Sequence, residues 1–195
     1  MNITFITSNN VKFRIAKEIL SRYGVEIEQH KMDLPELQSI DLDEVAMDKA
    51  RKAAETFKKD FIIDDTGFYI ASLGNFPGAL FKPTIYVLGE EKFLRLMNSE
   101  KDRKARFVSV LVFYDSRRNQ FKLISSTING KVTEELGKGT RRVGYSLERI
   151  FIPEGQKKAI SDLDDTEWET LYNEIKRGLH YEEFGKWLVD GYGKL

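Results

Sequence analysis

The chain has 195 residues, with 31 basic and 31 acidic side chains and no cysteine. The length fits one domain, or one core with a small second lobe. Because the charges balance, no global field directs the protein to nucleic acid or membrane, and a polyanion site must be a local patch. The lack of cysteine excludes disulfides, thiolate metal sites and cysteine nucleophiles.

Apolar residues come in short runs, and none approaches the roughly 20 residues that a membrane span needs. Met1 leads directly into a strand-like pattern, without the basic and apolar segments of a secretory signal. We therefore expect no membrane partner and a cytoplasmic protein.

Hydrophobic periodicity and turn residues predict alternating strands and helices. In chain order these are strand 3–6, helix 13–23, strand 25–29, helix 43–59, strands 61–63 and 68–70, helix 89–97, strands 105–114, 121–132 and 150–152, and helices 163–175 and 180–189.

Two neighbouring acids follow the short apolar strand 61–63. Thr66 and Gly67 come next and predict a turn, so that Asp64 and Asp65 would lie at the carboxyl edge of a sheet, where ligands bind in open α/β folds. Since adjacent strand residues face opposite ways, we expect Asp65 to face a cleft and Asp64 to support the backbone. An Asx-turn that ends the strand is the alternative interpretation.

Small polar residues fill residues 7–12, between the first strand and the first helix. Free backbone N–H groups and the positive end of a helix dipole favour phosphate there, and Lys12 would add a charge. Alternatively, Ser8, Asn9 or Asn10 only caps the helix.

Acids beside a phosphate site would repel the ligand unless a divalent cation lay between them. Magnesium typically bridges one or two carboxylates to substrate phosphate. The glycine-rich basic segment 137–146 could face the same cleft. The pattern therefore favours metal-dependent phosphate chemistry on a nucleotide-sized ligand, without indicating which bond reacts.

Several other enzyme classes lack their motifs in this sequence. There is no P-loop, no dinucleotide-binding G-x-G-x-x-G and no nucleophile elbow, and Asp64-Asp65-Thr66 lacks the spacer of the D-x-D-x-T phosphatases. His30 and His180 are isolated, and we expect each to be a surface or satisfied side chain.

Five segments occur in the order of one family's motifs: Thr7–Lys12, Leu34–Gln38, Asp64–Phe68, Leu73–Gly78, and Val143–Ser146 running into Ile150–Gly155. They are similar, in turn, to T-[GS]-N-x-x-K, L-P-E-[IY]-Q, [ED]-D-[ST]-G-[LF], L-x-G-x-P-G with Gly and Asn exchanged, and F-G-[YW]-D-P-I-F-x-P. Over nearly its whole length the chain resembles the inosine triphosphate pyrophosphatase family.

The resemblance implies Mg²⁺-dependent hydrolysis of non-standard purine nucleoside triphosphates such as ITP, dITP and XTP, giving the monophosphate and pyrophosphate. It implies an α/β fold, with a two-lobed mixed sheet flanked by helices and a central cleft. Residues 1–195 would form a single domain of two lobes, and the protein would be a homodimer without a nucleic-acid partner.

The resemblance also assigns roles to residues. Asp65 would be the general base, and Glu36, Asp65 and Asp64 would surround magnesium. Asn9, Lys12 and Lys49 would hold the phosphates, although helical spacing alone predicts that Lys49 extends to solvent. The implied substrate-binding residues are Thr7, Ser8, Asn9, Asn10, Val11, Lys12, Lys49, Thr66, Val143, Gly144, Tyr145, Ser146, Lys176 and Arg177.

The chain departs from the family pattern at the base-binding positions. Val143 replaces a base-stacking Phe, Ser146 replaces a base-contacting Asp, and Lys176 replaces a His. Losing an aromatic ring against a base costs about 1–3 kcal/mol in single-strand binders. A nucleotide-binding module with lost turnover or altered base preference is therefore the second hypothesis.

A third hypothesis is a single-strand nucleic-acid binder that uses four arginines. Their positions are Arg117, Arg118, Arg141 and Arg142. The neutral overall charge argues against it.

Overall fold

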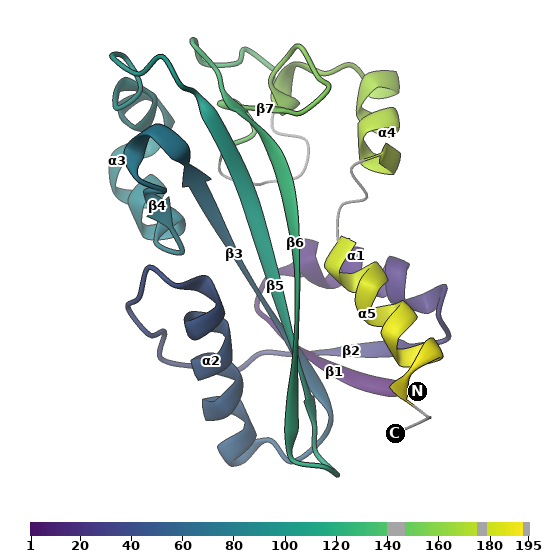
Figure 1. The fold of residues 1–195 in the computed structure, drawn as a ribbon. Coiled ribbons are helices and arrows are strands. Elements are labelled where there is room, and N and C mark those ends of the chain that lie inside the picture. Colours follow the sequence, from purple (N-terminus) through teal and green to yellow (C-terminus); the bar gives the residue numbers. More distant parts are fainter. Residues whose placement is uncertain (140–146, 175–178, 193–195) are drawn as a thin grey trace. The chain divides into compact units, whose positions relative to one another are not determined.

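The structure, a computed structural model, describes residues 1–139, 147–174 and 179–192 (Figure 1). The chain divides into two compact units. Unit 1 comprises Met1–Asp65, Ser109–Ser126 and Arg177–Leu195, and unit 2 comprises Thr66–Val108 and Thr127–Lys176. The strands follow the order β2-β1-β3-β5-β6-β7, with β4 paired to β3. The predicted α/β class, a mixed sheet with helices, is confirmed.

Unit 1 begins with a parallel crossover. β1 (Asn2–Ile6) pairs in parallel with β2 (Glu26–His30) and with the start of β3 (Phe61–Ile70). Parallel neighbours need a long connection, which is α1 (Asn10–Ser21) between β1 and β2. Unit 1 also contains parts of β5 (Lys104–Asp115) and β6 (Gln120–Val132), which follow β3 in the sheet order.

Helices cover both faces of the sheet in unit 1. α1 and α5 (Leu179–Asp190) lie on one side, and α2 (Leu42–Thr56) lies on the other (Figure 1). The core between α1, α5 and the strands includes Phe5, Ile19, Ile62, Phe113, Tyr181 and Phe184. The side chains that α2 buries are mainly small and include Ala46, Ala50 and Ala53.

Unit 2 has its own core. Besides parts of β3, β5 and β6 it contains β4 (Pro77–Gly78), α3 (Phe81–Arg95), β7 (Phe151–Pro153) and α4 (Asp165–Glu174). Two short 3₁₀ helices span Ala71–Leu73 and Ile160–Asp162. The rings of Phe68 and Phe151 lie 4.6 and 4.9 Å from that of Phe107, so aromatic packing stabilises this core.

The prediction of a turn after Asp65 was wrong. β3 continues without interruption from Phe61 to Ile70, and Thr66 and Gly67 are extended strand residues. Gly67 is needed for packing rather than for a turn, because a Cβ at this position would lie 2.7 Å from the ring of Tyr69. The two acids therefore lie within a strand instead of at its end.

The predicted helix 89–97 begins earlier in the structure, at Phe81. Gly89 has a φ of 71°, so the segment is two helical stretches joined by a kink. The sequence pattern revealed only the second stretch, since Pro83 and Gly89 interrupt the periodicity of the first.

Candidate functional site

Side-chain capping builds the turn between β1 and α1. Asn9 accepts hydrogen bonds from the backbone N–H groups of Val11 and Lys12, at 2.9 and 3.1 Å. Thr7 Oγ1 in turn accepts one from the N–H of Asn9 at 3.1 Å. The capping role that the sequence left open therefore belongs to Asn9. Ser8 is exposed, so the positive end of the helix lies at an accessible turn.

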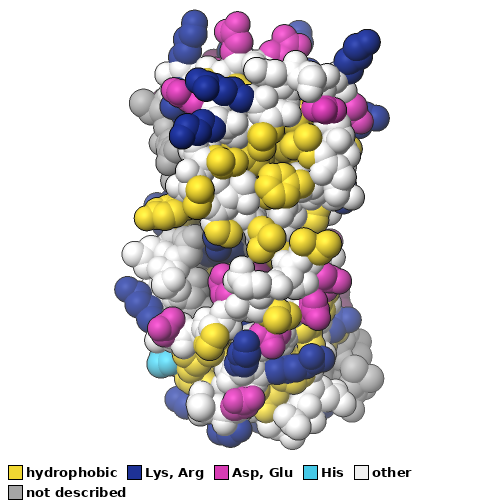
Figure 2. All heavy atoms as spheres, turned by 90° about the vertical axis from the view of Figure 1, so that its left-hand side faces the viewer, with side chains coloured by type: hydrophobic (Ala, Val, Ile, Leu, Met, Phe, Trp, Pro, Cys, Tyr) yellow, Lys and Arg dark blue, Asp and Glu magenta, His cyan; other side chains and the backbone are white. Residues whose placement is uncertain are grey.

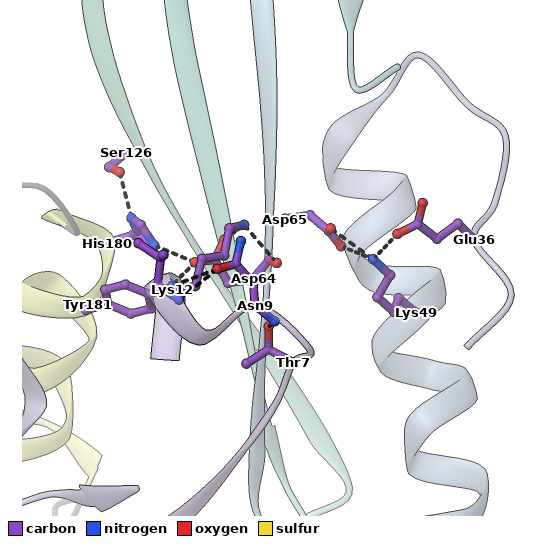
Figure 3. Close-up of polar contacts among 11 residues, drawn as sticks. Thr7, Asn9, Lys12, Glu36, Lys49, Asp64, Asp65, Ser126, His180 and Tyr181 are labelled. Carbon is purple, nitrogen blue, oxygen red and sulfur yellow. Dashed lines mark hydrogen bonds and ion pairs between the residues drawn. The ribbon is translucent and has the colours of Figure 1, made fainter. Parts of the chain in front are cut away.

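The two acids of β3 lie on opposite faces of the strand (Figure 3). Asp64 points toward α1 and α5, and Asp65 points toward α2. This follows from the alternation of side chains along an unbroken strand. Both are buried, yet they belong to different polar clusters.

Asp64 lies at the centre of a buried cluster. Its Oδ1 lies 2.7 Å from Lys12 Nζ, which also donates to the Asp64 carbonyl oxygen at 3.2 Å. Its Oδ2 accepts hydrogen bonds from Tyr181 and from His180 Nε2, the latter at 3.1 Å. The other nitrogen of His180 lies 3.0 Å from Ser126 Oγ. Both carboxylate oxygens are thus satisfied by named side chains of unit 1.

The cluster fixes the charge of Asp64. Burial alone raises the pKa of this carboxyl, but the Lys12 ammonium and His180 beside it lower the pKa well below its usual range. Asp64 is therefore an ionised acceptor in the folded protein at neutral pH.

Asp65 belongs to a second cluster with Lys49 and Glu36. Lys49 Nζ lies 2.9 Å from both oxygens of Asp65 and 2.8 Å from Glu36 Oε1. The Asp65 side chain is 8% exposed, whereas that of Glu36 is 56% exposed. The Lys49 ammonium therefore lies between a buried carboxylate and an accessible one. A further charged group could reach the cluster from the side of Glu36.

α2 positions both partners of Asp65. Asp41 caps the helix by accepting from the N–H groups of Asp43 and Glu44, and Lys49 projects from its middle. Lys52, one turn further, donates to the Pro35 carbonyl at 3.2 Å and ties the segment before Glu36 to the helix. Burial lowers the pKa of Lys49, but Asp65 and Glu36 raise it above the ordinary value overall.

Two of the three expected magnesium ligands lie together. Glu36 and Asp65 both contact the Lys49 ammonium. Asp65 Oδ2 lies beside Lys49 but accepts no hydrogen bond of good geometry from the described residues. These oxygens fit a hard cation. Asp64 does not join them, because it faces away and is occupied by Lys12. Among residues 1–139, 147–174 and 179–192, no group of three or more potential metal ligands occurs.

The other expected site residues fall into three groups. The turn contains Thr7, Ser8, Asn9, Asn10 and Val11, of which Ser8 and Asn10 are exposed. Thr66 belongs to unit 2 and is half-buried. Outside the described residues lie Val143, Gly144, Tyr145, Ser146, Lys176 and Arg177.

Sequence reasoning did not connect His180, Tyr181 and Ser126 with Asp64. His180 is indeed a satisfied side chain, as expected, but its partner is the acid next to Asp65. The spacing of His180, Phe184 and Leu188 by four residues does place the histidine on the buried face of α5. That signal could have indicated burial, but not the partner.

Solved structures share this fold. A HAM1 protein from Coxiella burnetii aligns with a TM-score of 0.77 at 21% identity, covering 98% of this chain and 100% of that chain. The Ham1 protein of Staphylococcus aureus aligns with a TM-score of 0.76 at 20% identity, covering 98% and 100%.

Relatives of higher identity also match along nearly the full length. A dITP/XTP pyrophosphatase of Methanopyrus kandleri is 36% identical over 187 residues, which covers 96% of each chain. One of Pyrococcus horikoshii is 35% identical over 189 residues, covering 96% of this chain and 97% of the relative. The Ham1 family matches residues 3–173. On this match and on relatives of 35–36% identity over nearly the full length, the chain belongs to the Ham1 family.

Proposed function

We propose that this protein hydrolyses the non-standard purine nucleoside triphosphates dITP, XTP and ITP to the monophosphate and pyrophosphate, in a magnesium-dependent reaction. Family membership and the names of its relatives support the substrate class. The observation that carries the chemistry is the convergence of Asp65 and Glu36 on the ammonium of Lys49.

In the proposed reaction Asp65 accepts a proton from a water molecule. The water oxygen forms a bond to the α-phosphorus, the bond from that phosphorus to the α–β bridging oxygen breaks, and pyrophosphate leaves. A positioned carboxylate base of this kind contributes typically about 10²–10⁴-fold to a rate. The side chain is buried and accepts a hydrogen bond at Oδ1 from Lys49, which constrains its orientation before substrate binds.

Glu36 and Asp65 would hold the magnesium ion, which when bound offsets negative charge on the polyphosphate. In addition to the metal ion, the Lys49 side chain supplies a positive charge. Its raised pKa keeps it protonated. Because the Lys49 ammonium already lies between the two carboxylates, it is suited to balance either their negative charge or that of an incoming phosphate.

The turn at the start of α1 would bind the remaining phosphate charge. Its positive helix end is accessible, and Lys12 lies in the first turn of the same helix. Lys12 is buried against Asp64, so its approach to phosphate depends on how that pair is held.

A panel of nucleoside triphosphates, assayed for pyrophosphate with magnesium and with a chelator, tests the proposal. We expect pyrophosphate release from dITP, XTP and ITP above that from ATP and GTP, and its loss with the chelator. Release of orthophosphate alone would contradict the proposal. Tight binding without hydrolysis, measured by calorimetry, would instead support the nucleotide-binding module.

We also propose that the protein is a homodimer. Hydrophobic side chains gather on one face of unit 2, on the side of α3 (Figure 2). Phe76, Tyr86 and Val87 are 42%, 91% and 74% exposed. Exposed apolar residues in such a group commonly mark a protein–protein interface.

We further propose that the protein is cytoplasmic and binds neither membrane nor nucleic acid. The equal numbers of basic and acidic side chains support the lack of nucleic-acid binding. In the described part of the chain, every helix is too short or too polar to cross a membrane.

A further inference from the structure

His180 is a buried titratable side chain that the proposed reaction does not use. His180 is 4% exposed and lies on α5, far along the chain from the residues it contacts. Its ring links Ser126 on β6 to Asp64 on β3, and its centroid lies 4.1 Å from that of Tyr181. Such a buried polar chain requires satisfied partners throughout, which the structure provides.

The proton position on the ring follows from the partners. Asp64 Oδ1 forms an ion pair with Lys12 and Oδ2 accepts from the Tyr181 hydroxyl, so the carboxylate is an acceptor and its contact with His180 Nε2 requires a proton on that nitrogen. Nδ1 then lies 3.0 Å from the Ser126 hydroxyl, which orients the ring from the other side. In this way α5 and β6 fix the direction from which Asp64 receives a hydrogen bond.

The orientation of the Asp64 carboxylate in turn fixes the position of the Lys12 ammonium. A carboxylate can rotate about its last torsion, but Oδ2 is held by His180 and Tyr181 together, and Oδ1 therefore remains directed at Lys12. The lysine has four torsions of its own and would otherwise be poorly ordered. Its ammonium receives its position from Asp64 Oδ1 and the Asp64 carbonyl.

We propose that His180 is a positioning residue for phosphate binding: through Asp64 it holds the Lys12 ammonium at the first turn of α1, where the triphosphate binds. The inference rests on the proposed function. Asp65 faces the opposite side of β3, so His180 acts on substrate binding and leaves the general base in place. Loss of His180 should therefore raise KM and leave kcat nearly unchanged.

The test compares two substitutions of the same residue. His180→Leu removes the donor at similar volume, and KM for dITP should rise about tenfold, because a hydrogen bond to a charged group is lost. His180→Gln retains an amide N–H near the Nε2 position, and KM should stay within about threefold of that of the unsubstituted protein. In both variants kcat should remain within about twofold.

His30→Gln is the matched control, since it removes the other histidine, whose ring packs near Phe57 outside this cluster. Its KM should equal that of the unsubstituted protein. A second readout needs no activity: nitrogen-15 NMR of the protein without ligand should show a protonated Nε2 on His180. That signal should disappear from the His180→Leu spectrum and persist in that of His30→Gln.

Unchanged KM in folded His180→Leu, an equal rise of KM in the Leu and Gln variants, or an unprotonated Nε2 would overturn the inference. If His180→Leu does not fold, the Gln variant and the NMR signal decide. If the unsubstituted protein binds triphosphates without hydrolysis, the proposed function fails, and calorimetric Kd values replace KM in the same comparison.

Discussion

Asp64 and Asp65 show how strongly position decides the role of a side chain. Both are buried aspartates on one strand, next to each other in the chain. Asp64 has four hydrogen-bond contacts to its side chain and main chain from Lys12, His180 and Tyr181. Asp65 is held by Lys49, beside an exposed carboxylate. The difference follows from strand alternation, which places Asp64 in the cluster with Lys12 and His180 and Asp65 in the cluster with Lys49 and Glu36.

The role proposed for Asp65 predicts a large loss of activity on isosteric substitution. In Asp65→Asn the side chain keeps its volume but cannot accept the proton of the attacking water. Pyrophosphate release from dITP should fall by about 100-fold or more. Steady-state kinetics measures it, with circular dichroism to verify the fold. Asp43→Asn, in the exposed first turn of α2, is the control and should retain full activity.

The ion pair of Asp64 predicts a loss of stability. Asp64→Asn leaves the Lys12 ammonium buried without its counter-charge, which should lower the free energy of unfolding by about 3–5 kcal/mol. Urea denaturation at neutral pH measures this change. Asp43→Asn should lie within about 0.5 kcal/mol of the unsubstituted protein, as surface substitutions usually do.

The same pair predicts a pH dependence with a defined sign. The folded-state pKa of Asp64 is lowered, so the unfolded chain binds its proton first as pH falls. The stabilisation is complete above the unfolded pKa of about 3.9 and is lost as pH falls toward the lower folded value. Urea midpoints measured from pH 6 to pH 3 should therefore decline more steeply for the unsubstituted protein than for Asp64→Asn. Parallel declines would contradict this assignment.

At the scale of elements, close backbone packing between β6 and β7 leaves no room for a side chain at Gly130. Gly130 pairs with Pro153, and a Cβ at Gly130 would collide with the Ile152 carbonyl oxygen and the Phe151 ring. Gly130→Ala should therefore lower the free energy of unfolding by about 1–3 kcal/mol, the usual cost of overpacking.

Thermal or urea unfolding of Gly130→Ala measures this cost. The exposed neighbour Asn129 provides the control, and Asn129→Ala should shift stability by less than about 0.5 kcal/mol. Equal stability of the two variants would show that β7 can move away from β6 without loss.

Periodicity was sufficient to predict most elements of this fold from sequence. The β5 and β6 hairpin, α2 and α5 lie within a few residues of their predicted bounds, because their apolar patterns are long and regular. The break expected after Asp65 was wrong, since Thr66 and Gly67 are typical of turns but lie extended within β3, where Gly67 leaves room for the Tyr69 ring. At these two residues tertiary packing therefore overrides the local preference for a turn.

The site could be predicted only in part. The family resemblance led to Asp65, Glu36 and Lys49, which the structure brings together. The partners of Asp64 could not be predicted, because His180 and Tyr181 come from α5, more than a hundred residues away. Contacts of such separation depend on how helices pack, which no local pattern records.

At the scale of the whole molecule, the exposed apolar group on α3 predicts self-association. Tyr86→Glu combined with Val87→Glu places two charges in the proposed interface and should convert the proposed dimer to a monomer. Light scattering coupled to size exclusion measures the mass. Val189→Glu is the matched control, because Val189 is 62% exposed on α5, and it should remain dimeric. A monomeric unsubstituted protein would contradict the dimer.

The central claim is that Asp65 directs water to the α-phosphorus, and oxygen labelling tests it most directly. Hydrolysis of dITP in ¹⁸O-water with magnesium should place one labelled oxygen in the monophosphate and none in pyrophosphate, and Asp65→Asn should abolish most of this incorporation. Label in pyrophosphate or in orthophosphate would show attack at another phosphorus and would contradict the account.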